Sequence, residues 1–270
     1  MSDFLKSMAT LSAARAATVP AGFSSSDFDK PLVPLTLGRF DVIAEIKNRS
    51  PAEGPLNDGD NYGASDLNSR AEAYAAGGAA AISVLTEPSR FDGDLAHLTS
   101  VAAAVPGTPV MRKDFLVDPV QIPEARKAGA SGVLLIATML GDATLREMLD
   151  RAWEHGMFVL LEAFDKDDLR RSSALLENPV ARDRADAGQL LIGVNTRNLR
   201  TLAVDAQRLQ KLAPLLPKAT CVAESGLAVA DDAARVASWG YRMALVGTAL
   251  MRSDDPAALI AAMRAAGAGA

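Results

Sequence analysis

The chain has 270 residues, of which 49% are hydrophobic and 23% are charged, a composition typical of a globular protein with one large domain or two small ones. Its 28 basic and 33 acidic side chains give a net charge of −5, which argues against a nucleic-acid-binding surface. The single cysteine excludes a disulfide framework and favours a reducing compartment, so we expect a cytoplasmic protein. The longest apolar run, residues 133–140, is too short to cross a bilayer, and we expect neither a membrane span nor a secretory signal.

Residues 1–40 stand outside any repeated pattern, and we expect them to form an extension made of a short helix and an extended lead. From residue 41 onward, eight short apolar runs follow one another, starting near residues 41, 80, 109, 132, 157, 190, 219 and 243. The intervals of 23 to 39 residues each leave room for a strand, two loops and a helix. Continuous apolar runs of this kind are typical of parallel strands that are covered on both faces.

The segments between these runs have helical features. In one of them Asp142 is the predicted N-cap, and apolar residues follow the i, i+3, i+4, i+7, i+8 spacing of a helix: Leu145, Met148, Leu149, Ala152 and Trp153. The pairs Asp118-Pro119 and Asp255-Pro256 each predict an N-cap followed by proline at the first helical position. Glycine precedes most of the apolar runs, which indicates that the helices end shortly before the strands begin.

Eightfold alternation of strand and helix predicts a (β/α)8 barrel, an α/β fold, over residues 41–270, with residues 1–40 covering its bottom or its rim. A doubly wound open sheet is the alternative, although such sheets more often have fewer units. In a barrel of this class, the chemistry lies at the carboxyl ends of the strands. The polar residues that end the apolar runs are therefore the candidates for a functional site.

Charged residues of inward parity end several of the runs. Because side chains alternate along a strand, Glu45 and Lys47 share a face with Ile43, and the same parity applies to Lys113 and Glu162. The further polar residues at strand ends are Asn195, Arg197, Glu224 and Ser225. Three carboxylates and two lysines in one pocket indicate general acid–base chemistry, because charges at short range shift each other's pKa. Taken alone, a glutamate or lysine at a strand end is more often a solvated loop residue. The occurrence of five such residues with inward parity argues against that interpretation.

The last two strand ends predict a phosphate site. Ser225-Gly226 and Gly247-Thr248 follow the seventh and eighth predicted strands, where barrels of this class commonly bind phosphate through backbone N–H groups. The alternative is that these glycines only permit tight turns. Arg197 would add a charged donor, and Ser50 after the first strand is either a further polar contact or part of a turn.

Metal and nucleotide chemistry have little support in the sequence. The two histidines, His97 and His155, lie 58 residues apart and lack metal-ligand spacing. Neither a GxGxxG nor a GxxxxGK[ST] motif occurs. We therefore expect no metal and no cofactor.

Six stretches of the chain resemble the indole-3-glycerol phosphate synthase family, barrel enzymes of tryptophan biosynthesis. The resemblance runs in order over roughly residues 40–252 and rests on residues 42–51 (VIAEIKNRSP), 82–86 (ISVLT), 110–115 (VMRKDF), 193–199 (GVNTRNL), 223–226 (AESG) and 246–247 (VG). It implies a carboxy-lyase that converts 1-(o-carboxyphenylamino)-1-deoxyribulose 5-phosphate into indole-3-glycerol phosphate, carbon dioxide and water. It also implies that the substrate is a phosphorylated small molecule and that the reaction needs no metal, flavin or nicotinamide. Contact with other enzymes of the same pathway stays an open possibility.

The resemblance implies a role for each candidate residue by its position. Lys113 resembles the general acid that protonates the ketone oxygen in ring closure, and Glu162 the acid–base residue of the later proton transfers. Lys47 resembles the lysine beside the substrate carboxylate and phosphate, and Glu45 would orient the lysines. Three further residues would line the pocket: Asn195, Glu224 and Ser225. The phosphate-side contacts would be Ser50, Arg197, Gly226, Gly247 and Thr248.

The chain also departs from the family pattern, and two other functions stay open. Thr196 stands where the family usually has asparagine, and Phe164 where a histidine is common. A sister phosphate-binding barrel isomerase uses a Cys/Asp pair, whereas the only cysteine, Cys221, lies inside the seventh predicted strand with its side chain toward the helices. The other alternative is a catalytically weakened paralogue that serves as a binding or scaffold subunit, and the retained acid–base residues argue against it.

Overall fold

The computed structural model describes residues 2–20, 22–50, 54–55, 64–197, 205 and 207–270. Eight parallel strands form a closed barrel, because β1 pairs with both β4 and β10. The strands are β1 (Asp41–Ile46), β4 (Ala81–Leu85), β5 (Val110–Lys113), β6 (Gly132–Ile136), β7 (Phe158–Ala163), β8 (Leu190–Asn195), β9 (Cys221–Glu224) and β10 (Met243–Val246). The predicted (β/α)8 barrel is confirmed, and each strand begins within two residues of its expected start.

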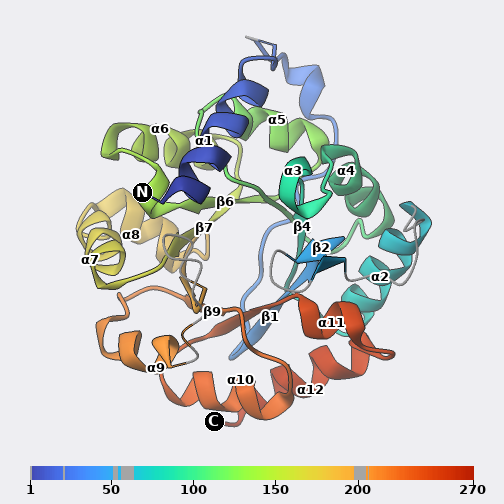
Figure 1. Ribbon diagram of the computed structural model, residues 1–270, viewed down its shortest axis with the longest axis vertical. Coiled ribbons are helices and arrows are strands. Elements are labelled where there is room, and N and C mark those ends of the chain that lie inside the picture. Colours follow the sequence, from blue (N-terminus) through green and yellow to red (C-terminus); the bar gives the residue numbers. More distant parts are fainter. Residues whose placement is uncertain (1, 21, 51–53, 56–63, 198–204, 206) are drawn as a thin grey trace.

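Helices surround the barrel as a ring (Figure 1). They are α2 (Ala64–Ala76), α4 (Leu95–Ala104), α5 (Gln121–Ala128), α6 (Asp142–Glu154), α7 (Lys166–Leu175), α8 (Pro179–Asp186), α9 (Arg208–Leu212), α10 (Ala230–Ser238) and α12 (Pro256–Ala268). Short elements occupy the loops: β2 (Arg49–Ser50), β3 (Gly54–Pro55), α3 (Pro88–Phe91), η2 (Ala137–Met139), η3 (Ala213–Leu215) and α11 (Thr248–Arg252). Within the described part of the chain, no helix combines the length and apolar character needed to cross a membrane.

One of the three predicted N-caps is confirmed and two are wrong. Asp255 caps α12 by accepting a backbone N–H of its first turn, and proline follows at the first helical position. Asp118 instead accepts the Val120 N–H at 2.9 Å and forms a turn ahead of α5. Helix α5 begins at Gln121, two residues later than a helix capped by Asp118 would. Asp142 is the first residue of α6 rather than its cap, and its carboxylate forms an ion pair with Arg171 of α7.

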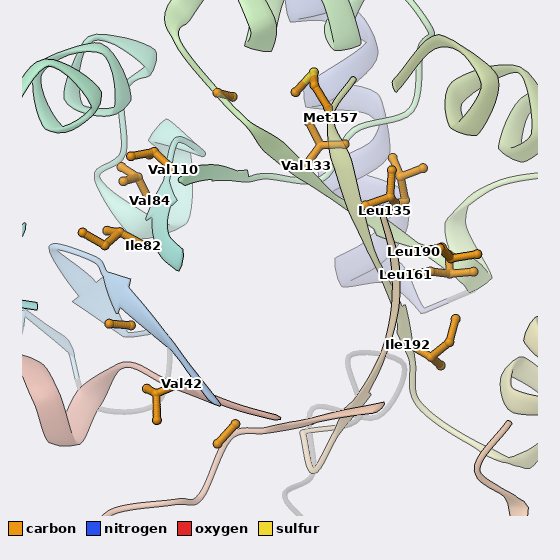
Figure 2. Packing of buried hydrophobic residues seen from close by; sticks show 14 of the residues in the cluster. Val42, Ile82, Val84, Val110, Val133, Leu135, Met157, Leu161, Leu190 and Ile192 are labelled. Atoms are coloured by element: carbon orange, nitrogen blue, oxygen red, sulfur yellow. The ribbon is translucent and has the colours of Figure 1, made fainter. Parts of the chain in front are cut away.

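Alternating residues of the strands build two separate apolar layers. Outward-facing side chains such as Val42 and Ile192 pack between the sheet and the helices (Figure 2). Inward-facing side chains such as Ile43, Met111 and Phe158 fill the barrel interior. The predicted parity of these strands is therefore confirmed, and it fixes which side chains can reach the mouth.

The N-terminal extension contacts both ends of the barrel. Helix α1 (Asp3–Ala16) crosses the mouth, where Leu5 and Met8 are buried with the interior side chains. The short helix η1 (Ser25–Phe28) packs against α5, and Leu37 then lies beside Gly188, just before β8 begins. The extension thus covers the rim with a helix and the bottom with an extended segment.

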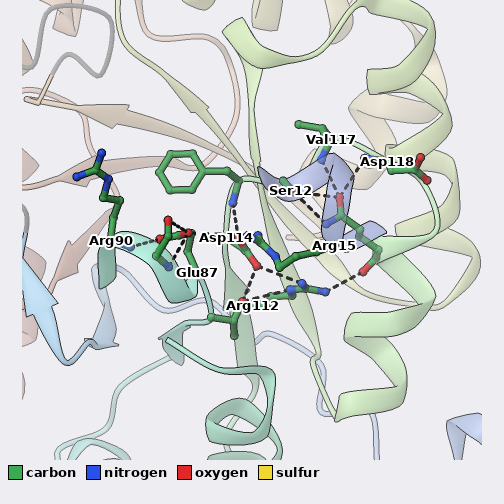
Figure 3. A network of polar contacts seen from close by, with 12 residues as sticks. Ser12, Arg15, Glu87, Arg90, Arg112, Asp114, Val117 and Asp118 are labelled. Carbon is green, nitrogen blue, oxygen red and sulfur yellow. Dashed lines mark hydrogen bonds and ion pairs between the residues drawn. The ribbon is translucent and has the colours of Figure 1, made fainter. Parts of the chain in front are cut away.

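A buried polar network fixes α1 to the loop after β5 (Figure 3). Arg15 of α1 forms an ion pair with Asp114, with 2.6 Å between Nη2 and Oδ1. Asp114 also accepts hydrogen bonds from Thr86 Oγ1 at 2.9 Å and from Arg112 Nη2 at 3.1 Å. Because Asp114 directly follows Lys113, this network anchors the segment that carries one of the candidate lysines.

Candidate active site

A cavity of about 870 Å³ opens at the carboxyl ends of the barrel strands. It is lined by most of the residues that the sequence nominated: Glu45, Lys47, Lys113, Glu162, Asn195, Arg197, Ser225, Gly226, Gly247 and Thr248. Glu224 lies beneath the wall, and the Ser50 side chain lies outside the described residues, although its backbone forms part of β2. The strand ends therefore bring residues from six barrel strands and their loops into one pocket.

Glu45 is the charge centre of the cavity. Its Oε1 lies 2.7 Å from Lys47 Nζ and its Oε2 lies 3.1 Å from Lys113 Nζ, so one carboxylate holds both ammonium groups. Burial opposes the charge on Glu45, but the two lysines outweigh it and lower the pKa of Glu45 to about 2. Glu45 is therefore ionised throughout the neutral range and pairs with both ammonium groups.

Lys113 is surrounded by carboxyl groups. Burial alone would lower its pKa, but Glu45, Glu162 and Glu224 outweigh burial and raise the pKa of Lys113 above its ordinary value. Lys113 Nζ lies 3.9 Å from Glu224 Oε2, which is an ion-pair distance but too long for a hydrogen bond. Lys113 therefore lines the cavity as a charged donor.

Glu162 and Glu224 come from the strands on either side of β8, and their carboxyl groups are close enough to interact. Asn195 Nδ2 donates a hydrogen bond of 3.1 Å to Glu162 Oε1, which fixes one oxygen of that carboxyl group. Glu224 was expected to line the pocket; its side chain is fully buried and is not among the described residues that line the cavity. Strand parity correctly placed Glu224 on the inner face but carries no information on how deeply the side chain is covered.

The loops after β9 and β10 form the side of the cavity where phosphate binding was predicted. Ser225 has a φ of 68° and Gly226 a φ of 77°, a left-handed turn that is costly for serine. Helix α11 begins at Thr248, directly after Gly247. A methyl group at Gly247 would collide with Glu45 Oε1, so the missing side chain lets this loop pass close to the Glu45 carboxylate.

Aromatic and aliphatic side chains line the opposite wall, and the sequence reasoning did not assign them to the site. Phe115 packs edge-on against Phe4, with ring centroids 5.8 Å apart, and lies 6.0 Å from Phe91. Leu134 and Ile136 of β6 complete this wall. Phe115 shares the parity of Lys113, which would have located it, whereas Phe4 comes from α1 and no repeat in the sequence points to it.

The residues that depart from the family pattern lie close to the site. Thr196 lines the cavity and is buried, and Phe164 packs among the side chains of the barrel interior. Cys221 faces the helices, as predicted from its parity, and burial raises the pKa of its thiol to about 12. The position and pKa of Cys221 exclude it from acid–base work in the barrel mouth.

The fold and the site together define a (β/α)8-barrel enzyme with a pocket for acid–base chemistry, apolar on one wall and rich in charge and glycine on the other. Among the described residues, no group of three or more histidine, cysteine, aspartate or glutamate side chains is arranged to hold a metal ion. The chemistry that the arrangement supports is proton donation by Lys113 and proton exchange through Glu162.

A family model described as indole-3-glycerol phosphate synthase matches residues 17–263, so the chain belongs to this family. A protein of this name from Nocardioides sp. (strain ATCC BAA-499 / JS614) is 46% identical over 235 residues, covering 86% of this chain and 84% of its own length. One from Azospirillum brasilense is 42% identical over 229 residues, covering 84% and 80%. A structure of 3-hexulose-6-phosphate synthase from Salmonella typhimurium aligns with a TM-score of 0.61 at 17% identity over 84% of this chain and 98% of that one, a likeness of fold alone.

Proposed function

We propose that this chain converts 1-(o-carboxyphenylamino)-1-deoxyribulose 5-phosphate into indole-3-glycerol phosphate, carbon dioxide and water by general acid–base catalysis. The observation that carries the proposal is the arrangement of Lys113 and Lys47 on the two oxygens of Glu45, facing an apolar wall in a cavity of about 870 Å³. Such a pocket accepts a molecule with one aromatic ring and two anionic groups.

Lys113 acts on the ketone oxygen. This oxygen gains negative charge as the ring carbon attacks the carbonyl carbon, and a positioned ammonium stabilises that charge in a partly closed pocket. The raised pKa of Lys113 keeps its proton in place before the attack, so Lys113 first serves as a charged hydrogen-bond donor. Transfer of the proton follows as the alkoxide becomes the stronger base.

Glu162 serves the later steps. Once carbon dioxide has left, the new hydroxyl group must take a proton and leave as water, while a substrate proton is lost and the indole ring becomes aromatic. Asn195 holds one oxygen of Glu162 at 3.1 Å, which leaves the second oxygen for proton exchange. This assignment is supported by the position of Glu162 on the cavity wall.

The anionic groups of the substrate are assigned to the charged and glycine-rich parts of the pocket. Lys47 lies on the wall where it can neutralise the carboxylate that leaves as carbon dioxide. The phosphate contacts are assigned to Arg197, to the end of β2 and to the loops after the last strands: Ser50, Arg197, Gly226, Gly247 and Thr248. The aromatic wall around Phe115 would receive the aminobenzoate ring.

Further assignments of the same proposal concern the whole chain. We assign residues 41–270 to one catalytic domain and residues 1–40 to an extension of it, supported by the burial of Leu5 and Met8 in the barrel interior. A cytoplasmic location and contact with other enzymes of tryptophan biosynthesis stay predictions. The isomerase alternative is disfavoured because Cys221 faces the helices.

The test is direct. Purified protein is incubated with 1-(o-carboxyphenylamino)-1-deoxyribulose 5-phosphate, and indole fluorescence is followed over time. We expect the wild type to produce the signal and Lys113→Ala to produce it far more slowly. Substrate binding without any indole signal would support a scaffold subunit instead.

A further inference from the structure

The proposed reaction consumes one proton in each turnover. The substrate enters with an ionised carboxylate that leaves as neutral carbon dioxide. Ring closure adds one proton to the ketone oxygen, dehydration adds a second to the leaving hydroxyl group, and aromatisation returns one. The protein therefore has to supply one proton that the substrate does not give back.

Glu224 is placed to hold such a proton. As an ionised group it would have no hydrogen-bond donor for either carboxyl oxygen among the described residues, although the side chain is fully buried. The nearest cation, Lys113, lies 3.9 Å away and is 3.1 Å from Glu45 instead. A buried carboxylate that accepts no hydrogen bond and has only this long ion pair is costly, whereas a protonated carboxyl group carries no charge to bury.

The absence of a side chain at Gly193 leaves the space that the Glu224 carboxyl group occupies beside Glu162. Gly193 of β8 stands beside Glu162 of β7 in the sheet register, and Glu224 belongs to β9 on the other side. A methyl group at Gly193 would overlap Glu224 Oε1. The missing side chain therefore admits the Glu224 carboxyl group into the barrel at the level of Glu162.

We propose that Glu224 enters each turnover protonated, donates its O–H to Glu162 across Gly193, and stores the proton that the reaction consumes. The inference rests on the proposed function for its catalytic consequence. When the hydroxyl group leaves, the O–H bond of Glu224 breaks as a new O–H bond forms on Glu162, and Glu162 passes a proton to the departing water. Lys113 regains the proton lost from the substrate, and Glu224 takes up its replacement from bulk water.

Charges around Glu224 agree with this assignment. Burial contributes most to raising its pKa, the facing Glu162 raises it further, Lys113 lowers it, and Glu45 raises it. When Glu224 carries a proton, the negative charges of Glu45 and Glu162 balance the positive charges of Lys47 and Lys113. Glu224 acts through Glu162 and does not line the cavity, so its loss should affect proton supply more than substrate binding.

Infrared spectroscopy of the substrate-free protein tests the protonation directly. At neutral pH we expect the carbonyl-stretch band of a buried protonated carboxyl group, which shifts in D₂O and disappears as pH rises through the raised pKa of Glu224. The band should be absent from Glu224→Gln and present in Glu87→Gln, a matched change of a buried carboxylate that caps α3. Absence of the band from the wild type, or its survival in Glu224→Gln, would overturn the proposal.

Kinetics test the catalytic consequence. Glutamine at position 224 keeps the shape and a donor but releases no proton, so Glu224→Gln should lower kcat by about 10²-fold with little change in KM. We expect the wild-type kcat to fall as pH rises and Glu224 loses its proton, and we expect this fall to be absent from Glu224→Gln. Wild-type kcat and pH profile in Glu224→Gln would contradict the storage role. If the wild type itself forms no indole, the proposed function fails, while the infrared result still decides the protonation of Glu224.

Discussion

The lower and upper parts of the barrel interior are built by the same strands and hold opposite chemistry. In β1, Ile43 is packed in the apolar interior and Glu45, two residues later on the same face, binds two lysines. In β5, Met111 and Lys113 repeat this change. The comparison teaches that strand parity selects the inner face, while the distance along the strand decides whether a side chain stabilises the fold or faces the substrate.

The largest expected effect is on the apolar layer. Phe158 of β7 is buried in the interior, four residues before Glu162. Phe158→Ala should lower the free energy of unfolding by about 3–5 kcal/mol, because it removes buried surface and leaves a cavity. Denaturant unfolding measures the loss, and Phe158→Leu should lose less. A large fall in kcat of the folded variant, without loss of stability, would contradict the separation of the two layers.

An intermediate effect is expected at the rim of the charged layer. Arg197→Ala should raise KM by roughly tenfold or more and lower kcat less, since hydrogen bonds to charged groups contribute about 1.5–3 kcal/mol and an anionic group is bound in ground and transition states alike. Steady-state kinetics give both constants. Arg197→Lys keeps the charge and should fall between the wild type and the alanine variant. An unchanged KM in Arg197→Ala would remove Arg197 from the binding site.

The smallest effect is expected outside the barrel interior. Cys221 packs against the helices, and its Sγ approaches the Pro217 and Ala219 carbonyl oxygens at 3.7 and 3.5 Å. Cys221→Ser should cost about 1–2 kcal/mol of stability by placing a hydroxyl group among apolar side chains, and leave kcat unchanged. Because burial raises the pKa of the thiol to about 12, alkylation of the folded protein should be slow. Rapid alkylation with loss of activity would show that Cys221 is accessible.

Local pattern predicted the barrel and the convergence of its charged strand ends. Glu45 and Lys113 could be placed from sequence because side-chain alternation is a property of the strand itself. Features that depend on a contact with a second element could not be predicted in this way. Phe4 lines the pocket only because α1 docks on the barrel. Asp142 pairs with Arg171 of another helix and does not cap its own. The depth of Glu224 follows from the absence of a side chain at Gly193, a contact between neighbouring strands that parity alone does not reveal.

The central claim is that Lys113 is the acid of ring closure and that Lys47 acts on an anion present throughout the reaction. Both lysines bind the same carboxylate and both have side chains 15% exposed, so alanine variants of the two form a matched pair. Measurement of kcat and KM for Lys113→Ala and Lys47→Ala tests the claim most directly. We predict that Lys113→Ala lowers kcat by at least about 10²-fold with a small change in KM, and that Lys47→Ala acts in part through KM. Near-normal kcat in Lys113→Ala together with abolished kcat in Lys47→Ala would contradict the account and exchange the two roles.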